Sequence, residues 1–324
     1  MGLTPMYLLG TDEAGYGPNL GPLLIAVSAW SIPDELDPAE LNDCVAHVIA
    51  REVPAARQRD ERWVIADSKQ LYNPARGLEL LERQFHVALG LLGLQAARWR
   101  DLWQSGLVVG STPLDATHWH AEFDEPLPLA APPVDETVVQ RILTGLADCG
   151  VTLELLRARA VFPHEFNQLV DRHETKSHVL SSLTLELLCQ AIRALPPGKT
   201  LAVCDKHGAR NRYGALLQPH VDAWIEVLRE SAEESAYRWL EPERSVELRL
   251  QPRCEAHLPA ALASMTAKYL RELAMRAFNH FWCVRIPDLK PTAGYPLDAR
   301  RFADAIRATQ AELAIDDVML WRKK

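Results

Sequence analysis

Two adjacent carboxylates, Asp12 and Glu13, end a short apolar run near the start of the chain. The glycines at positions 15, 17 and 21 follow within eight residues, which is costly in a core element because glycine loses the most backbone freedom on folding. We call residues 15–17 the glycine turn; its pattern indicates that another molecule approaches the backbone closely. Neighbouring residues of a strand point to opposite faces, so both acids can serve one site only if the chain leaves the pleat there.

The same run has two other interpretations. A surface hairpin with acids at its turn would need no ligand. A dinucleotide-binding loop would need G-x-G-x-x-G and a following helix that holds the pyrophosphate at its N-terminus. Here the glycine spacing is one residue longer, Pro18 and Pro22 disfavour that helix, and the two acids would repel a pyrophosphate.

The run Gly10-Thr-Asp-Glu-Ala-Gly-Tyr-Gly-Pro18 resembles the opening signature of the type 2 ribonuclease H family, ribonucleases HII and HIII. Further blocks resemble the family in the same order: Asp67-Ser68-Lys69-Gln70-Leu71, Asp205 after an apolar run, Ala263-Ser264 with Ala267-Lys268, and Gly294-Tyr295-Pro296. They span most of the chain. One departure is Tyr16, which stands where the family has a basic residue.

The resemblance implies a metal site made by four carboxylates, Asp12, Glu13, Asp205 and Glu255. Asp12 would be shared by two Mg²⁺ or Mn²⁺ ions, which activate water and stabilise the leaving oxygen of a phosphodiester. The fourth acid needs a small shift in its loop, because Cys254 takes the aligned position. A thiol is a poor partner for Mg²⁺, so Glu255 is favoured over it; the alternative is that Glu255 is a surface acid after a strand.

The resemblance also implies a substrate: the RNA strand of RNA/DNA hybrids, or ribonucleotides embedded in duplex DNA, cut to leave a 3′-hydroxyl and a 5′-phosphate. The 2′-hydroxyl would be probed by the glycine turn and a tyrosine, and phosphates by nearby cations. The residues implied in binding are Gly15, Tyr16, Gly17, Lys69, Lys176, Arg210, Arg212, Lys268 and Tyr295. Each cation alone has a plainer interpretation, such as a solvated loop or, for Lys268, an ion pair with Glu272 one helical turn on.

Two other classes of function remain open at this point. One is a catalytically inactive or altered-specificity relative that binds nucleic acid, which the change at Tyr16 permits. The other is a nucleotide-cofactor enzyme that uses the glycine loop. His118 and His120 form a possible metal pair, but no third ligand lies nearby in the sequence.

Composition narrows the class of protein. The 324 residues are 48% hydrophobic and 24% charged, which is typical of a globular protein. No apolar run is long enough to span a membrane and no basic flank precedes the first apolar stretch, so a cytoplasmic protein is expected. The six cysteines lack zinc or disulfide spacing. A net charge of −8 means that a nucleic acid would be gripped locally.

The pattern of apolar residues predicts the elements that must position these side chains. We expect an N-terminal hairpin, then helices and strands in alternation, then a helical tail. The expected strands are 7–12, 23–30, 152–162, 200–205 and 245–251, and the expected helices are 37–53, 74–92, 177–195, 219–240 and 258–282. The fold class is α/β, with a ribonuclease H-like mixed sheet flanked by helices. It is expected to be a single domain with insertions at about 91–152 and 217–246.

Overall fold

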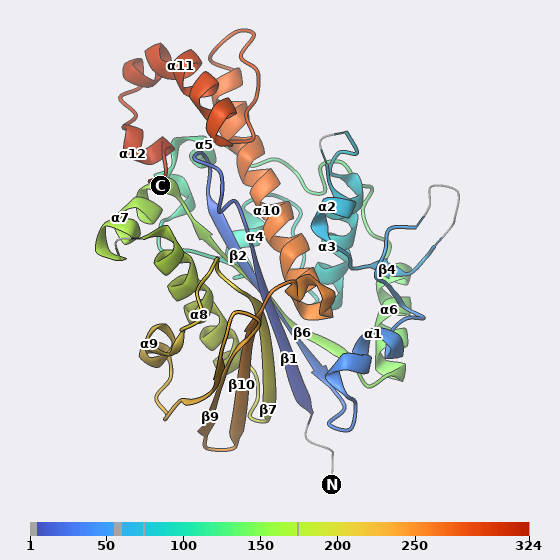
Figure 1. Ribbon diagram of the computed structural model, residues 1–324. Coiled ribbons are helices and arrows are strands. Elements are labelled where there is room, and N and C mark those ends of the chain that lie inside the picture. Colours follow the sequence, from blue (N-terminus) through green and yellow to red (C-terminus); the bar gives the residue numbers. More distant parts are fainter. Residues whose placement is uncertain (1–4, 55–59, 74, 174, 324) are drawn as a thin grey trace.

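A mixed eight-stranded sheet runs through the chain in the computed structural model, which describes residues 5–54, 60–73, 75–173 and 175–323 (Figure 1). Across the sheet the strands are β5 (Val108–Val109), β6 (Thr152–Val161), β2 (Leu23–Ile32), β1 (Met6–Ala14), β7 (Lys199–Asp205), β10 (Arg244–Gln251), β9 (Ser235–Glu241) and β8 (Glu226–Glu230). A separate parallel pair joins β3 (Ile49–Ala50) to β4 (Trp63–Val64).

Strand direction changes at β1, near the middle of the sheet. β1 pairs antiparallel with β2, and β2 antiparallel with β6, whereas β7 runs parallel to β1 and β10 parallel to β7. The carboxyl ends of β1, β7 and β10 therefore meet at one edge. This edge receives Asp12 and Asp205.

Helices cover both faces of the sheet (Figure 1). The α-helices are α1 (Leu41–Cys44), α2 (Ser68–Leu71), α3 (Glu79–Leu91), α4 (Asp101–Gln104), α5 (His118–Ala121), α6 (Glu136–Asp148), α7 (Pro163–His173), α8 (Lys176–Ala194), α9 (Gly214–Leu217), α10 (Leu258–Cys283), α11 (Pro296–Glu312) and α12 (Asp317–Leu320). Four short 3-10 segments are η1 (Pro38–Glu40), η2 (Leu114–Ala116), η3 (Gln218–His220) and η4 (Cys254–Ala256).

The central helix α10 packs on β1 at backbone distance. A side chain at Gly10 would place its Cβ 2.2 Å from the backbone nitrogen of Ala260, so only glycine fits there. Alternate β1 residues divide between two cores: Leu8 packs with α10 and α3, and Leu9 packs with α8. This close contact fixes the position of α10 relative to β1.

The C-terminal portion is helical and folds back on the sheet edge. α11 and α12 follow α10 and pack around Phe278, Phe302 and Trp282. α12 lies beside α7, which brings the end of the chain close to the glycine turn (Figure 1). Within the part of the chain that the structure describes, no helix is both long and apolar enough to cross a membrane.

The α/β class, the mixed sheet and the helical C-terminal portion are confirmed. The N-terminal hairpin and the strands predicted at 152–162, 200–205 and 245–251 are present, as are the helices predicted at 177–195 and 258–282. The helix predicted at 74–92 begins only at Glu79; residue 74 lies outside the described ranges.

Three local predictions are wrong. Residues 219–240 form the strands β8 and β9 instead of a helix, because Tyr237 and Trp239 alternate onto the core and pair along β10. Residues 37–53 form only the short η1 and α1 before β3, where pairing with β4 overrides the helical spacing. No helix was expected between residues 97 and 150, but this segment contains the 13-residue helix α6. That this is one domain with two insertions stays a prediction.

Candidate active site

Asp12 and Asp205 lie side by side on neighbouring parallel strands. Thr11 of β1 pairs with Cys204 of β7, and each acid is the next residue of its strand. Both alternate onto the same face as Gly10, the face covered by α10. The sheet therefore brings together two carboxylates that are separated by most of the sequence.

Asp12 is enclosed by α10. Burial raises the pKa of Asp12 to about 6, and the nearby charges of Asp205 and Glu255 raise it further, while a hydrogen bond with Ser264 of α10 acts in the opposite direction. Ser264 in turn shares a 3.2 Å hydrogen bond with the hydroxyl of Ser68. Two sequence blocks that resemble the family, around Ser68 and Ser264, thus meet behind Asp12.

Glu13 is placed differently from the expectation. β1 continues in regular pairing with β2 through Ala14, so the chain does not leave the pleat at the two acids. Glu13 therefore alternates onto the opposite face from Asp12. Burial, followed by the charges of Asp12 and Asp205, raises the pKa of Glu13 to about 8. The charges of Glu13, Asp12 and Asp205 thus affect one another, although the side chain of Glu13 lies on the opposite face of the sheet.

Cys254, which aligns with the family's fourth carboxylate, and its neighbour Glu255 have different surroundings. Cys254 is buried, and its thiol donates to the carbonyl of Cys204 over 2.9 Å. Arg253 adopts a left-handed conformation (φ 65°), and the exposed Glu255 lines a cavity of about 500 Å³ together with Asp205. The turn of η4 thus directs the acid, and not the thiol, toward Asp205.

Asp205 is half-buried at the mouth of this cavity. Its pKa is raised by burial first and then by the charge of Glu255, while backbone N–H groups, including those of Lys206 and Arg253, act to lower it. The pKa values of Asp12, Glu13 and Asp205 are raised for the same two reasons: the carboxyls are buried away from water, and other anionic groups lie close to them. A bound cation would relieve both contributions.

The donor chemistry fits a hard divalent cation, but a finished cage is not present. Among the residues that the structure describes, no three His, Cys, Asp or Glu side chains are already arranged to hold a metal ion. Asp12, Asp205 and Glu255 offer the carboxylate oxygens that Mg²⁺ and Mn²⁺ prefer.

The glycine turn lies directly after these acids and next to Tyr295. Gly15 has φ +90°, and a Cβ there would lie 2.6 Å from both the Arg271 side chain and a backbone oxygen. Gly17 is exposed, and a Cβ built on it would lie 3.9 Å from the ring of the half-exposed Tyr295. The two elements expected to probe a ribose, far apart in the sequence, are thus neighbours.

Two of the five proposed phosphate contacts converge on Tyr16. The ammonium group of Lys176, at the start of α8, lies 4.9 Å from the centre of the Tyr16 ring. Burial raises the pKa of Tyr16, Glu13 raises it further and the charge of Arg210 lowers it, so Arg210 is also within electrostatic reach. Cations from other elements therefore surround the tyrosine that replaces the family's basic residue.

The other three cations, Lys69, Arg212 and Lys268, have surroundings that do not include the glycine turn. Lys69 is exposed on α2. Arg212 lies 3.6 Å from Glu230 of β8, and Lys268 makes a 2.6 Å ion pair with Glu272. The plainer interpretation of Lys268, an ion pair along the helix, is the one observed.

Known proteins were compared with the chain. No protein-family model and no curated protein matches it. Similar solved structures include ribonucleases HII and HIII.

Bst-RNase HIII in complex with Mn²⁺ aligns with 99% of this chain and 67% of its own, at 13% identity and a TM-score of 0.42. Ribonuclease H2 from Pyrococcus horikoshii OT3 aligns with 97% of this chain and 92% of its own, at 14% identity and a TM-score of 0.41. RNase HII in the PCNA complex from Archaeoglobus fulgidus gives 12% identity and a TM-score of 0.41, over 98% of this chain and 94% of the other. The likeness is too distant to assign an activity, which must come from the side chains themselves.

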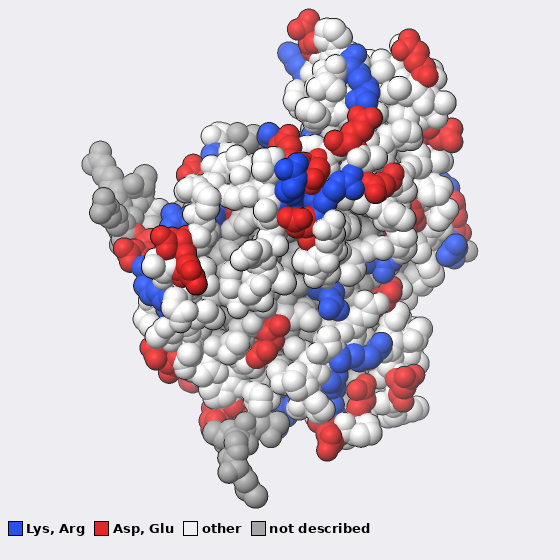
Figure 2. Space-filling view, turned by 180° about the vertical axis from the view of Figure 1, so that it is seen from behind, with Lys and Arg blue, Asp and Glu red and all other residues white. Residues whose placement is uncertain are grey.

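Basic and acidic residues are mixed on the face of the molecule seen in Figure 2. Figure 2 shows the molecule from behind, with Lys and Arg side chains interspersed among Asp and Glu on a mostly uncharged surface. Arg98 and Asp124, for example, form a 2.7 Å ion pair. This distribution agrees with a local grip on any nucleic acid, as the net charge predicts.

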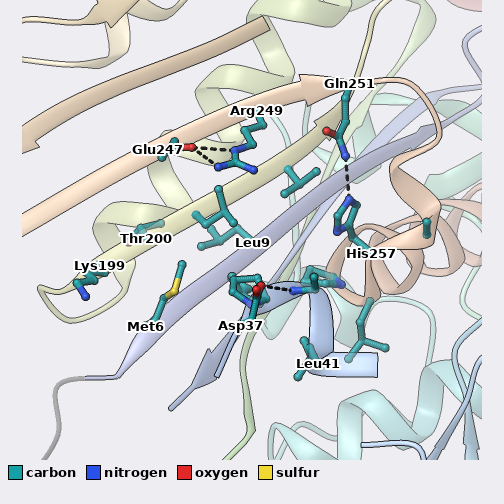
Figure 3. Close-up of a pocket in the computed structure, with 18 of the residues that line it drawn as sticks. Met6, Leu9, Asp37, Leu41, Lys199, Thr200, Glu247, Arg249, Gln251 and His257 are labelled. Atoms are coloured by element: carbon teal, nitrogen blue, oxygen red, sulfur yellow. Dashed lines mark hydrogen bonds and ion pairs between the residues drawn. The ribbon is translucent and has the colours of Figure 1, made fainter. Parts of the chain in front are cut away.

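A larger cavity, of about 630 Å³, lies on the same face of the sheet as α10, beside the first residues of that helix, Leu258 and Pro259 (Figure 3). Leu201 and Val203 form part of its lining, and Gln251 and His257 meet at one end over 2.8 Å. Its size alone would make it the first candidate for a ligand site. It lacks converging carboxylates, so we place the chemistry at Asp12 and Asp205.

Several residues take positions that the sequence did not indicate. His207 is buried, its Nδ1 lies 3.0 Å from the hydroxyl of Ser181, and burial lowers its pKa to about 4. His120 is also buried and stacks on Trp99. Arg322, near the end of the described chain, carries no recognisable signal in the sequence. Its importance follows from its contacts with the carbonyl oxygens of Gly15 and Pro18.

Proposed function

We propose that the chain is a divalent-metal-dependent endoribonuclease. It would hydrolyse the RNA strand of RNA/DNA hybrids, or cut at ribonucleotides embedded in duplex DNA, and leave a 3′-hydroxyl and a 5′-phosphate. The observation that carries the proposal is the meeting of Asp12, Asp205 and Glu255 beside a glycine turn that lies next to Tyr295. Neither feature alone would specify a ribonuclease.

The acids would hold the metal. Asp12 and Asp205, with Glu255 and Glu13 on either side, would bind two Mg²⁺ or Mn²⁺ ions, which supply Lewis-acid activation of water and charge stabilisation at the leaving oxygen. In the absence of a cation, the raised pKa values mean that Asp12 and Glu13 keep a proton up to about pH 6 and about pH 8. Metal binding would therefore release protons.

The remaining residues would select and hold the substrate. The backbone of the glycine turn and the ring of Tyr295 are placed to test for a 2′-hydroxyl, because that group is what separates RNA from DNA. Lys176 and Arg210 would hold a backbone phosphate beside Tyr16. Sequence-independent contacts of this kind suit an enzyme that recognises sugar type and not base identity.

A cleavage assay tests the proposal. End-labelled RNA/DNA hybrid, a DNA duplex with one ribonucleotide and an all-DNA duplex are incubated with Mg²⁺, Mn²⁺ or EDTA. We expect cuts only in the ribonucleotide-containing duplexes and only with metal, with 5′-phosphate ends, and no cutting by Asp12→Asn. Intact substrates under every metal condition would refute a nuclease.

Two observations favour a second candidate, a relative that binds hybrids without cutting them. Tyr16 replaces a basic residue, and the acids of the described chain are not preassembled around a metal. Fluorescence anisotropy with the same duplexes separates the two candidates. Binding of hybrid in preference to DNA, with no metal-dependent product, would establish the binding protein.

A further inference from the structure

The glycine turn is held from below by an arginine near the C-terminal end of the chain. The Nη2 group of Arg322 donates to the carbonyl oxygens of both Gly15 and Pro18. Arg322 is 4% exposed, and its guanidinium lies over the ring of Phe166. One planar group thus links Gly15, the first residue of the glycine turn, to Pro18, which follows the turn.

The backbone of the C-terminal segment adds to this contact. The N–H of Arg322 donates to the carbonyl of Asn19 over 2.9 Å, and Trp321 forms an antiparallel bridge with Leu20. The segment is itself fixed to α7, because Asn167 donates to the carbonyl of Trp321 over 2.7 Å and accepts from the N–H of Lys323 over 2.8 Å. The turn is therefore anchored to α7 through residues 321–323.

Because the peptide unit is planar, the contact of Arg322 with the Gly15 carbonyl also determines where the next N–H group points. The C=O of Gly15 and the N–H of Tyr16 belong to one trans peptide unit and point in opposite directions. Since Arg322 holds that C=O, the N–H of Tyr16 points away from Arg322. Within the described residues, neither the N–H of Tyr16 nor that of Gly17 has a hydrogen-bond acceptor in the protein.

Two arginines lie beneath the turn, and of these Arg271 has a carboxylate nearby, with its Nη1 3.8 Å from Glu272. Arg271 packs under Gly15 and is also buried, and burial followed by the charge of Arg271 lowers the pKa of Arg322 to about 9. Nε of each arginine lacks a hydrogen-bond partner in the described part of the chain. Two buried cations under a turn with two free N–H groups favour an oxygen-rich, anionic group on its outer side.

We infer that Arg322 is a positioning residue for ribose recognition: it orients the glycine turn so that the N–H groups of Tyr16 and Gly17 face the sugar and phosphate of a ribonucleotide. This inference rests on the proposed function, and it adds an element to it that lies far from the acids in sequence. Arg322 itself does not touch the substrate.

The test compares binding by the full chain of three labelled duplexes, namely RNA/DNA hybrid, the same hybrid with 2′-O-methyl groups, and DNA, in Ca²⁺ or EDTA. The variants are Arg322→Ala, Arg322→Lys and Asn167→Ala, with Arg307→Ala as the surface control, since Arg307 pairs only along its helix with Asp304. We expect a loss of about 10-fold in affinity for hybrid in Arg322→Ala and Asn167→Ala, and little change for DNA. Arg322→Lys keeps the charge but not the planar fork, so it should show most of the loss.

A second measurement guards against misfolding. Hydrogen exchange of a peptide covering residues 15–20 should be faster in Arg322→Ala and Asn167→Ala, with exchange in α10 unchanged. A folded Arg322→Ala protein that prefers hybrid over DNA as strongly as the unmodified chain would overturn the inference. If the unmodified chain shows no preference for hybrid at all, the proposed function fails instead, so the two outcomes are distinguishable.

Discussion

Asp12 and Asp205 occupy adjacent positions on parallel strands, each one residue beyond the paired Thr11 and Cys204. The parallel register leaves no freedom to separate them, because a shift by one residue would move one of the acids to the opposite face of the sheet. Their mutual repulsion is thus a built-in property of the fold. It makes the edge a place where a cation is stabilising.

The fourth carboxylate can be identified by a paired substitution. We expect Glu255→Gln to lower the metal-dependent cleavage rate by about 10- to 100-fold, because it removes one charged oxygen donor from the cavity shared with Asp205. Cys254→Ser should change the rate little, since a hydroxyl can still donate to the carbonyl of Cys204. Rates at several Mg²⁺ concentrations provide the measurement; the reverse ranking of the two variants would contradict the assignment.

The acids should make the metal-free protein less stable as pH rises. Folded-state pKa values of about 6 for Asp12 and about 8 for Glu13 lie above their ordinary values, so folding favours the protonated forms. Their contribution is complete below about pH 4 and is lost as pH rises through 6 and 8. Asp12→Asn should therefore be more stable than the unmodified protein at pH 8 in EDTA, by about 2 kcal/mol.

Denaturant unfolding at pH 5 and pH 8, with EDTA or with Mg²⁺, measures this difference. The advantage of Asp12→Asn should shrink at pH 5, and Mg²⁺ should stabilise the unmodified protein but not the variant. An Asp12→Asn protein that is less stable at pH 8 without metal would show that the carboxylate is not under electrostatic strain.

Lys176 should contribute a phosphate contact, and Arg212 should not. Lys176 lies over Tyr16, whereas Arg212 pairs with Glu230. We expect Lys176→Ala to weaken hybrid binding irrespective of base sequence and to reduce the slope of log K against log salt by about 1. Binding titrations between low and moderate salt test this, with Arg212→Ala as the matched variant expected to leave the slope unchanged; equal slopes for both variants would remove Lys176 from the interface.

Gly10 should be essential for stability because of its contact with α10. A Cβ at this position would lie 2.2 Å from the backbone nitrogen of Ala260, which cannot move as a side chain could. Gly10→Ala should lower the free energy of unfolding by at least about 2 kcal/mol. Gly214→Ala is the control, since its Cβ would meet only the Tyr237 ring at 3.7 Å; similar unfolding midpoints for both variants would contradict the prediction.

The sequence by itself determined the strongly periodic elements and the local motifs. The first strand, which contains Asp12, the helix from Leu258 and the strand ending at Asp205 follow from apolar patterning. The glycine turn follows from its glycine and proline residues. These signals are local, so they survive in the sequence. The helix predicted over β8 and β9 failed because partner strands, which a single sequence does not display, decided the conformation.

Only the tertiary structure decided which residues share the site. The parallel register set Asp205 beside Asp12, the η4 turn buried Cys254 and left Glu255 lining a cavity with Asp205, and the return of the chain past α7 set Arg322 under the glycine turn. Each of these contacts joins segments that are far apart in sequence. Their geometry follows from strand order and helix packing, and these are properties of the whole fold.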